Sequence, residues 1–524
     1  MSQKQWSNST NASKSPKASN PHPSLPRSIE MPFQGEPPGR LSQGAIASNP
    51  EFQAFLKSCE PIEGPDPEAT SSLLAQFKSY EPDSFIPDHL LAVDGGEYVS
   101  SVSEHFPSRE ILHIRIGSVL LDLAGIRQIQ ALSETTVDPF EVQKIQQDTS
   151  ALTLWFPGAN IVRGDARSPQ QGFRACLREA MVSEETRLNG RLLLDTIYEA
   201  LAARALAEGG LSNYDPSTEE MLVTHCPSPD CAEERLDQPV RLARDTESAP
   251  CPRCQERVYA TDALRLHEAF SDHQGNQGLV SRTRNLCEHL LLLHYLLYLQ
   301  DQNPNALSEF GFVMDGPLAI FGEGARFHRS LMRVISNIYE RAETAQVPPP
   351  VIFGVQKSGA VLEFAQSLDR VPRETSSGES GPEVAAEQRA GAIPNGTVLS
   401  VTDDIRFTYI TPKSEANRSI HGYDTYYGQD LIVKTHAGRL FVVNVAYPFG
   451  SKGTDAFKHR RFDLEAYPGL GRSLGVLEAV ESGLYGNSTV PQMLAHRFSS
   501  ISRVPGGKIL DILAQRHVGS NRER

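Results

Sequence analysis

The sequence lacks a hydrophobic run long enough to span a membrane. Its longest apolar stretch, Leu290 to Leu299, is interrupted by His294, whereas a membrane-spanning helix needs about 20 apolar residues. The N-terminal sequence MSQKQWSNSTNASKSPK has no apolar segment after its basic residues, so it does not resemble a secretory signal. We therefore expect no membrane helix, and a cytoplasmic location.

The sequence is also poor in positive charge. Lys and Arg number 50 against 64 Asp and Glu, which gives a net charge of −14. This balance excludes a uniformly basic nucleic-acid coat protein, although a local basic groove could still bind nucleic acid. With 39% hydrophobic and 22% charged residues over 524 positions, the composition is typical of a soluble protein with a sizeable core.

Cysteine is scarce and unevenly distributed. The seven cysteines are an odd number and favour a reducing compartment over a disulfide scaffold. Four of them form two knuckles, CPSPDC and CPRC, separated by nineteen residues, with thiols at Cys226, Cys231, Cys251 and Cys254. This spacing predicts a structural Zn²⁺ site, because four thiolates leave no open coordination position. The neighbouring His225 is an alternative ligand.

Composition divides the chain into segments. Residues 1–50 are rich in Ser, Pro and Asn and predict a disordered tail, and residues 372–395 predict a flexible surface loop. Between them strands and helices alternate, which favours an α/β fold with a cysteine-bearing insertion at 222–258. Strands are expected at Leu90–Val93, Ile111–Leu123 (in two pieces), Glu309–Met314 and Val351–Val355, helices at Ser168–Ala207, Ser281–Gln300 and Gly324–Ala345, and a hairpin at Leu431–Pro448.

Two aspartates follow apolar strands. Asp94 lies in LLAVDGG and Asp315 lies in GFVMDGP. Asp-Gly after a strand is ordinary turn chemistry. However, adjacent strands could bring both carboxylates to one divalent cation.

Two further residues could complete such a site. Glu288 lies on a helix that is apolar nearly all round, where a carboxylate must be paired or bound to metal; pairing with Arg284 or a place in an exposed first turn is the alternative. His496 is either a packed or capping residue or a ligand. A nitrogen ligand would favour Mn²⁺ over Mg²⁺.

The order of these motifs resembles the NurA nuclease family. The motifs are the strand-end Asp94-Gly95-Gly96, VMDGPLAIFG around Asp315, FGVQKSG, YYGQDLIVKTHAG and LAH at His496. The cysteine insertion followed by YATDALRLHEAF is similar to the zinc-ribbon-bearing bacterial branch of that family. The resemblance covers residues 85–515.

The resemblance implies an RNase H-like α/β core, with a mixed sheet, flanking helices and an inserted zinc ribbon. It implies Mn²⁺- or Mg²⁺-dependent hydrolysis of DNA, as a 5′ to 3′ exonuclease and single-strand endonuclease acting on DNA ends in repair. It further implies a homodimer docked on a HerA-type hexameric translocase. Carried over by position, Asp94, Glu288 and Asp315 are catalytic metal ligands, and His496 binds metal or positions the scissile phosphate.

One departure and one electrostatic requirement accompany the resemblance. Archaeal members place a Tyr eight residues before the histidine, where this chain has Ser488, and the nearby Tyr485 is out of register. Because an acidic site in an acidic protein repels DNA, we expect a cationic rim that includes Lys357, Lys434 and Arg460.

Two other functions compete with the nuclease. The chain could be a non-catalytic DNA-end-binding or assembly subunit of the same fold, which the missing Tyr favours. It could also be an actin-like sugar kinase or ATPase, because a strand followed by Asp-Gly-Gly opens the phosphate-binding hairpin of that superfamily. In this chain Glu97-Tyr98-Val99 replaces the usual Thr-containing continuation.

Overall fold

The computed structural model describes residues 49–59, 65–103, 105–125, 146–208, 213–231, 235–370, 391–481, 489–501 and 506–519. Most of the expected tail (1–50) and loop (372–395), together with Tyr485 and Ser488, lie outside the described residues. The chain divides into two units, Met1–Glu63 and Gly64–Arg524. The first contains helix α2 (Pro50–Ser58), which Asn49 caps and which buries no side chain.

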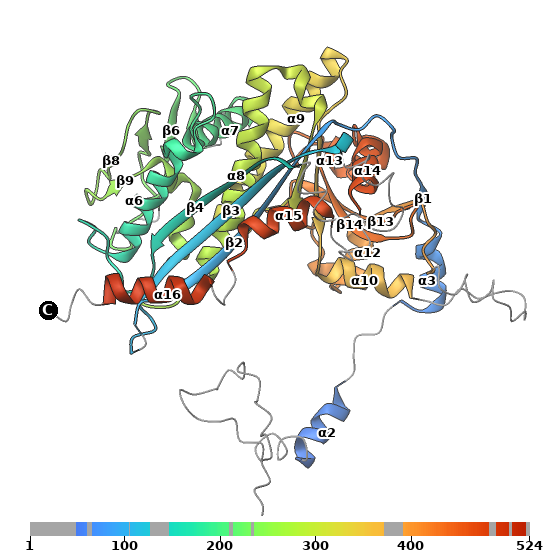
Figure 1. Ribbon diagram of the computed structural model, residues 1–524, viewed down its shortest axis with the longest axis horizontal. Helices are drawn as coiled ribbons and strands as arrows, with labels where there is room; N and C mark the ends of the chain where they lie inside the picture. Colours follow the sequence, from blue (N-terminus) through green and yellow to red (C-terminus); the bar gives the residue numbers. More distant parts are fainter. Residues whose placement is uncertain are drawn as a thin grey trace, which may run out of the picture. The chain divides into compact units, whose positions relative to one another are not determined.

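Among the described residues of Gly64–Arg524, nine strands form one mixed sheet (Figure 1). In spatial order they are β1 (Lys78–Ser79), β12 (Thr397–Ser400), β13 (Gly428–Lys434), β14 (Leu440–Ala446), β11 (Val351–Gln356), β10 (Phe310–Asp315), β2 (His89–Ser101), β3 (Glu110–Asp122) and β4 (Gln146–Pro157). Strand β10 is parallel to both β2 and β11, and the other neighbouring pairs are antiparallel.

The run β4-β3-β2-β10-β11 is an antiparallel meander followed by two parallel strands. This is the topology of an RNase H-like core. The prediction of an α/β fold with a mixed sheet and flanking helices is therefore confirmed.

Helices cover both faces of the sheet. They are α3 (Pro67–Leu74), α6 (Pro169–Met181), α7 (Leu193–Glu208), α8 (Gln277–Gln302), α9 (His328–Ala345), α10 (Ala360–Asp369), α12 (Asp403–Ile405), α13 (Asp455–Arg460), α14 (Leu470–Val480), α15 (Val490–Ser499) and α16 (Lys508–Ala514). Two small sheets, β5 (Tyr214–Asp215), β6 (Glu220–Val223) and β7 (Val240–Leu242), then β8 (Ala249–Pro250) and β9 (Arg257–Val258), lie in or beside the cysteine insertion.

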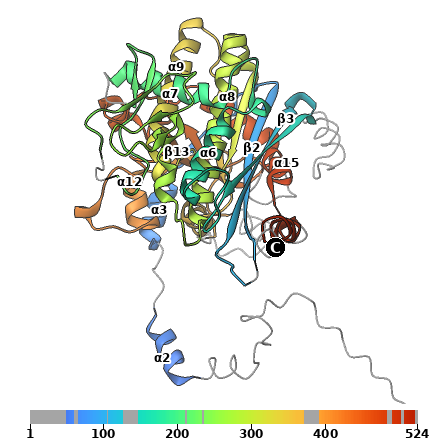
Figure 2. The same cartoon turned by 90° about the vertical axis from the view of Figure 1, so that its left-hand side faces the viewer.

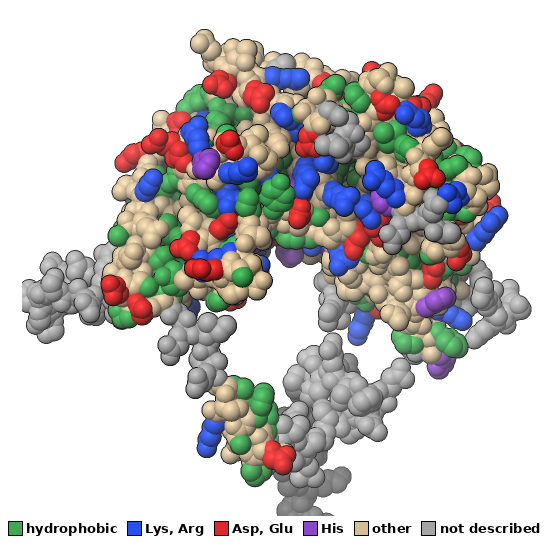
Figure 3. Space-filling model, turned by 180° about the vertical axis from the view of Figure 1, so that it is seen from behind, with side chains coloured by type: hydrophobic (Ala, Val, Ile, Leu, Met, Phe, Trp, Pro, Cys, Tyr) green, Lys and Arg blue, Asp and Glu red, His purple; other side chains and the backbone are tan. Residues whose placement is uncertain are grey.

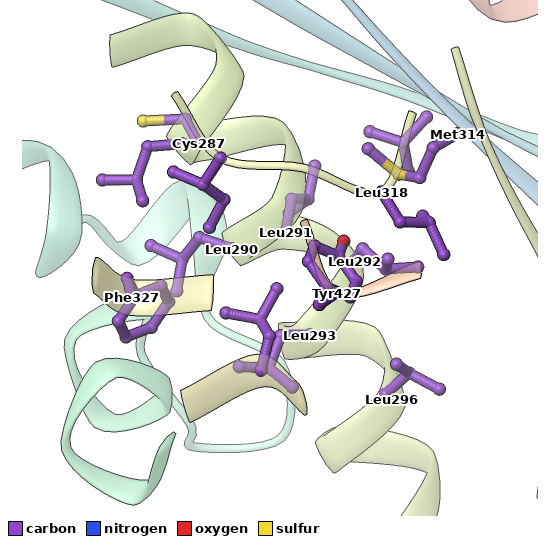
Figure 4. Packing of buried hydrophobic residues seen from close by; sticks show 14 of the residues in the cluster. Cys287, Leu290, Leu291, Leu292, Leu293, Leu296, Met314, Leu318, Phe327 and Tyr427 are labelled. Atoms are coloured by element: carbon purple, nitrogen blue, oxygen red, sulfur yellow. The ribbon is translucent and has the colours of Figure 1, made fainter. Parts of the chain in front are cut away.

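The central helix α8 is buried on nearly all sides. Its leucines from Leu290 to Leu293, with Leu296, pack against Phe327, Leu318 and Tyr427 (Figure 4). A helix that is apolar around its whole circumference belongs in a protein interior, so the helix predicted at Ser281–Gln300 forms and is longer than expected. In the part of the chain that the structure describes, no helix is long and apolar enough to cross a membrane.

Helices α8 and α15 pack on opposite faces of β2 and β3 (Figure 2). Two neighbouring glycines in β2 each face one of these helices, because successive strand residues face opposite sides of the sheet. A Cβ on Gly95 would lie 2.3 Å from Glu288 Oε1 of α8, and one on Gly96 would lie 2.4 Å from the carbonyl oxygen of Ser499 in α15. Glycine at both positions therefore lets the two helices approach the strand closely.

Three element predictions differ from the structure. The short strand expected at Leu90–Val93 is part of the longer β2, so Asp94-Gly95-Gly96 lies within a strand and not at its end. The continuous helix expected at Ser168–Ala207 is wrong, because residues 182–192 separate α6 from α7. This connection contains a 3₁₀ helix at Glu184–Thr186, and Asn189 and Gly190 in it have positive φ. The strand expected in two pieces is one continuous β3. The hairpin is confirmed as β13 and β14, and Gly438 in its turn has φ +79°.

We predict that Gly96→Ala destabilises the fold. The new methyl group meets the backbone of α15 rather than a flexible side chain, and such overpacking costs about 1–3 kcal/mol. The measurement is the free energy of unfolding in urea. Gly278→Ala is the control, because a Cβ there meets nothing within 4 Å and alanine favours a helix; an equal loss in both variants would contradict the prediction.

Candidate functional site

Asp94 and Asp315 meet because of the register between parallel strands. Val93 of β2 pairs with Met314 of β10, so Asp94 follows the last pair just as Asp315 does. Strand β10 ends at Asp315, whereas β2 continues to Ser101. Residues in register on neighbouring strands project to the same face, which places both carboxylates on the face that α15 covers.

Helix α15 presents a stripe of polar side chains to these carboxylates. Gln492, His496 and Ser499 are spaced by four and three residues, so they share one face of the helix. His496 Nδ1 lies 2.9 Å from Asp94 Oδ2, and Ser499 Oγ donates to the same oxygen at 2.7 Å. These two side chains of α15 therefore fix the orientation of the Asp94 carboxylate.

Gln492 joins α15 to the ends of two strands. Its Nε2 donates to Asp315 Oδ1 at 3.2 Å and to the carbonyl oxygen of Val355 at 3.0 Å. Its Oε1 accepts from the backbone N–H of Thr489 at 3.2 Å, in a capping box that begins the helix. The buried amide thus holds the start of α15 and the Asp315 carboxylate in one arrangement.

An open cleft of about 420 Å³ lies beside these groups. Asp94, Asp315 and His496 line it, together with Lys357 and Arg284. One potential ligand atom from each of Asp94, Asp315 and His496 lies within 4.8 Å of the others. Two carboxylate oxygens and one imidazole nitrogen fit a divalent cation, and the nitrogen suits Mn²⁺ better than Mg²⁺.

The electrostatics of the cleft also favour a cation. Burial, with the nearby Asp94, raises the pKa of Asp315 to about 6, although Lys357 opposes this shift. Lys357 Nζ lies 2.6 Å from Asp315 Oδ2. Two adjacent carboxylates that are partly removed from water repel each other, so positive charge placed between them stabilises their ionised forms.

Glu288 lies beside this group rather than within it. Its side chain is buried and pairs with Arg284, whose guanidinium also contacts Glu97. Burial raises the pKa of Glu288 to about 8; Arg284 opposes this, while Asp94 and Asp315 add to it. Helix α8 therefore places Glu288 close enough to both aspartates for their charges to raise its pKa, and Arg284 is its ion-pair partner.

The two other residues expected on a cationic rim are not among those that line the cleft. Lys434 is 5% exposed and pairs with Asp369, so its charge is already neutralised and the rim role expected for it is wrong. Arg460 is an exposed residue of α13 at 3.8 Å from Asp463. Lys357 alone of the three lies at the cleft.

The four clustered cysteines converge as their spacing predicts. The sulfur atoms of Cys226, Cys231, Cys251 and Cys254 all lie within 4.8 Å of one another. Four convergent thiols are compatible with a tetrahedral zinc site. His225 does not belong to this group; its Nδ1 lies 2.9 Å from Thr224 Oγ1.

Sequence reasoning missed Gln492 and Ser499, and it treated Arg284 only as a partner for Glu288. A signal for the first two existed, because their spacing from His496 puts all three on one helical face. Whether that face meets the strand ends depends on how α15 packs on β2 and β10.

The chain matches no protein-family model and no curated protein. Among solved structures, it is similar to the NurA nuclease from Sulfolobus solfataricus at 10% identity and a TM-score of 0.31, over 92% of this chain and 98% of that chain. A structure of NurA with manganese gives 11% identity and a TM-score of 0.21, over 91% and 98%. With scores this low, neither likeness supports a conclusion about function.

We predict that Gln492→Ala lowers the free energy of unfolding by about 1–3 kcal/mol, because it removes a buried donor from the Asp315 carboxylate and one of the two donors to the Val355 carbonyl. Chemical denaturation measures the change. The control is Arg497→Ala, at an exposed position of the same helix, where a surface substitution changes stability by about 0.5 kcal/mol or less. Equal stability of the two variants would show that Gln492 does not clamp the helix to the sheet.

Proposed function

We propose that the protein is a metal-dependent deoxyribonuclease that hydrolyses phosphodiester bonds. The observation that carries this proposal is the convergence of Asp94, Asp315 and His496 donor atoms within 4.8 Å in an open cleft. Oxygen-rich sites of this kind hold the divalent ions used in phosphoryl chemistry. The order of the sequence motifs supports the same activity.

The residues of the chain have distinct roles in this proposal. A bound divalent ion would supply an acidified water and neutralise charge on the phosphate. Asp94 and Asp315 would hold it, with His496 as the nitrogen ligand. Ser499 and Gln492 orient the two carboxylates through the hydrogen bonds described above, which fixes the donors before substrate arrives.

The choice of DNA as substrate rests on the sequence resemblance and on charge at the cleft. Figure 3 shows basic and acidic side chains mixed over the face seen from behind, so attraction of a polyanion must be local. Lys357 and Arg284 supply positive charge at the cleft itself. Both side chains are 27% exposed and could contact backbone phosphates.

The finer properties are proposed from the sequence resemblance. They are 5′ to 3′ exonuclease and single-strand endonuclease activity, a preference for Mn²⁺, action on single strands and DNA ends in repair, a homodimer, and a HerA-type translocase as partner. Glu288 is proposed as a further metal ligand, and the cysteine cluster as a structural Zn²⁺ site.

A specific observation keeps the second function in competition. Asp315 and Glu288 already have internal cationic partners, Lys357 and Arg284. A cleft whose negative charge is partly neutralised without a metal would also suit a non-catalytic subunit that binds DNA ends. Variants of the aspartates separate the two functions.

We predict that Asp94→Asn and Asp315→Asn each lower the rate of DNA cleavage by at least about 100-fold, because each removes a charged ligand from the cation site. Single-stranded DNA labelled at its 5′ or 3′ end, incubated with Mn²⁺ or Mg²⁺, reports both rate and polarity. Fluorescence polarisation tests whether the variants still bind DNA.

The matched control is Asp404→Asn, which changes an exposed aspartate paired with Arg418. It should cleave like the unaltered protein. If the unaltered, folded protein binds DNA ends yet leaves them intact with either metal, the protein is a binding subunit rather than a nuclease.

We predict that the purified protein contains one zinc ion per chain, and that Cys251→Ser loses it and unfolds at a lower temperature. Four thiolates hold the ion, and its binding free energy contributes to folding. Elemental analysis and thermal melting measure the two effects. Cys59→Ser is the control, since Cys59 is an exposed thiol outside the cluster; retention of zinc by Cys251→Ser would contradict the assignment.

A further inference from the structure

One carboxylate that lines the cleft and one that is buried beside it are each paired with a positively charged side chain. Lys357 Nζ contacts Asp315, and Arg284 Nη1 contacts Glu288. Lys357 follows the end of β11, and Arg284 lies one helical turn before Glu288 on α8. Both cationic residues line the same cleft as Asp94 and His496.

We propose that Arg284 and Lys357 are internal counter-ions that occupy the cation positions of the cleft and thereby set its affinity for divalent ions. This inference rests on the proposed function, in which the cleft binds such ions. The counter-ions neutralise Asp315 and Glu288 before an ion arrives, and an arriving ion displaces them.

Glu288 lies on the α8 face of β2, against the residue that follows Asp94. Its Oε1 occupies the space that a side chain at residue 95 would fill, since a Cβ there would lie 2.3 Å away. The carboxylate is thus pressed against the backbone of the residue that follows Asp94. It is 3% exposed, and a buried carboxylate needs compensation by a charge or a metal.

Arg284 can leave Glu288 without losing every partner. Its Nε contacts Glu97, which also accepts a hydrogen bond from Ser281 on the same helix. The guanidinium is 27% exposed, so displacement from Glu288 leaves it at the water-filled side of the cleft. Its positive charge therefore does not become a buried unpaired charge.

A structural ion pair elsewhere in the chain shows the contrast. Arg174 and Asp262 are each 2% exposed, and Arg174 also bonds Glu256. Breaking that pair would strand charges in the interior, which is strongly destabilising. Arg284 and Lys357 are partly exposed, so a metal ion can displace them from their carboxylates. Arg174 is buried, so its ion pair stays intact in the folded protein.

The test measures the binding of Mn²⁺ alone. Electron paramagnetic resonance reports the concentration of the free ion during the titration. We expect Arg284→Gln and Lys357→Gln to bind Mn²⁺ about tenfold more tightly than the unaltered protein. A nearby positive charge lowers the pKa of a carboxylate by about 1–3 units, and about tenfold in Kd corresponds to the smallest of these shifts. Asp94→Asn is titrated in parallel, to subtract binding outside the cleft.

Arg282→Gln is the matched control. Arg282 lies two residues before Arg284 on α8 and pairs with Glu323 at 2.7 Å, and it is not among the residues that line the cleft. Its removal should leave the Kd for Mn²⁺ unchanged.

A double-mutant cycle shows whether Arg284 acts through Glu288. In the Glu288→Gln background, Arg284→Gln should no longer tighten Mn²⁺ binding. Circular dichroism and melting confirm that each variant is folded. If Arg284→Gln does not fold, Arg284→Lys replaces it, with a smaller tightening expected because an ammonium cannot bridge Glu97 and Glu288 as the guanidinium does.

The outcomes separate this inference from the proposed function. If the unaltered protein binds Mn²⁺ through Asp94 but the folded Arg284 and Lys357 variants bind no more tightly, the counter-ion role is overturned and the metal site stands. If the unaltered protein has no Asp94-dependent Mn²⁺ binding, the proposed metal site and the counter-ion role both fall.

Discussion

The parallel register between β2 and β10 is the constraint on which the whole site depends. It places Asp94 beside Asp315 although more than two hundred residues separate them in the chain. A slip of one residue would turn one carboxylate to the opposite face of the sheet. Buried residues such as Phe312 and Val313 face both sides of β10, so apolar packing against helices on both faces opposes such a slip and protects the site.

The sheet supplies the carboxylates, but a helix from near the far end of the chain completes the arrangement. His496 and Ser499 reach Asp94 across about four hundred residues, and Gln492 ties the start of the same helix to Asp315. Close approach of α15 to β2 depends on the absence of a side chain at Gly96. The geometry of the site therefore depends directly on the packing of α15, since the contacts that dock this helix on the sheet also orient the carboxylates.

Local patterns in the sequence predicted the residues whose position follows from their own element. Each of Asp94 and Asp315 directly follows an apolar run that forms a central strand, so both could be named in advance, although β2 continues past Asp94 to Ser101. Gln492 and Ser499 could not, because their role depends on which helical face meets the sheet. Lys434 was misplaced because a lysine looks exposed in isolation. Its strand is buried along its whole length, as the apolar run before it already indicated.

The net charge of the chain says little about the field inside the cleft. The charges that sum to the net charge of −14 are distributed along the whole chain, and salt screens exposed charges from one another beyond about 10 Å at 0.1 M ionic strength. At the cleft the balance is set by a few neighbours: Asp94, Glu97 and Asp315 carry negative charge, Arg284 and Lys357 carry positive charge, and the buried Glu288 pairs with Arg284 from beside the cleft. An overall acidic protein can thus neutralise part of the negative charge at its cleft with two internal cations, and the exchange of one cation for another changes the local field more than any distant surface charge does.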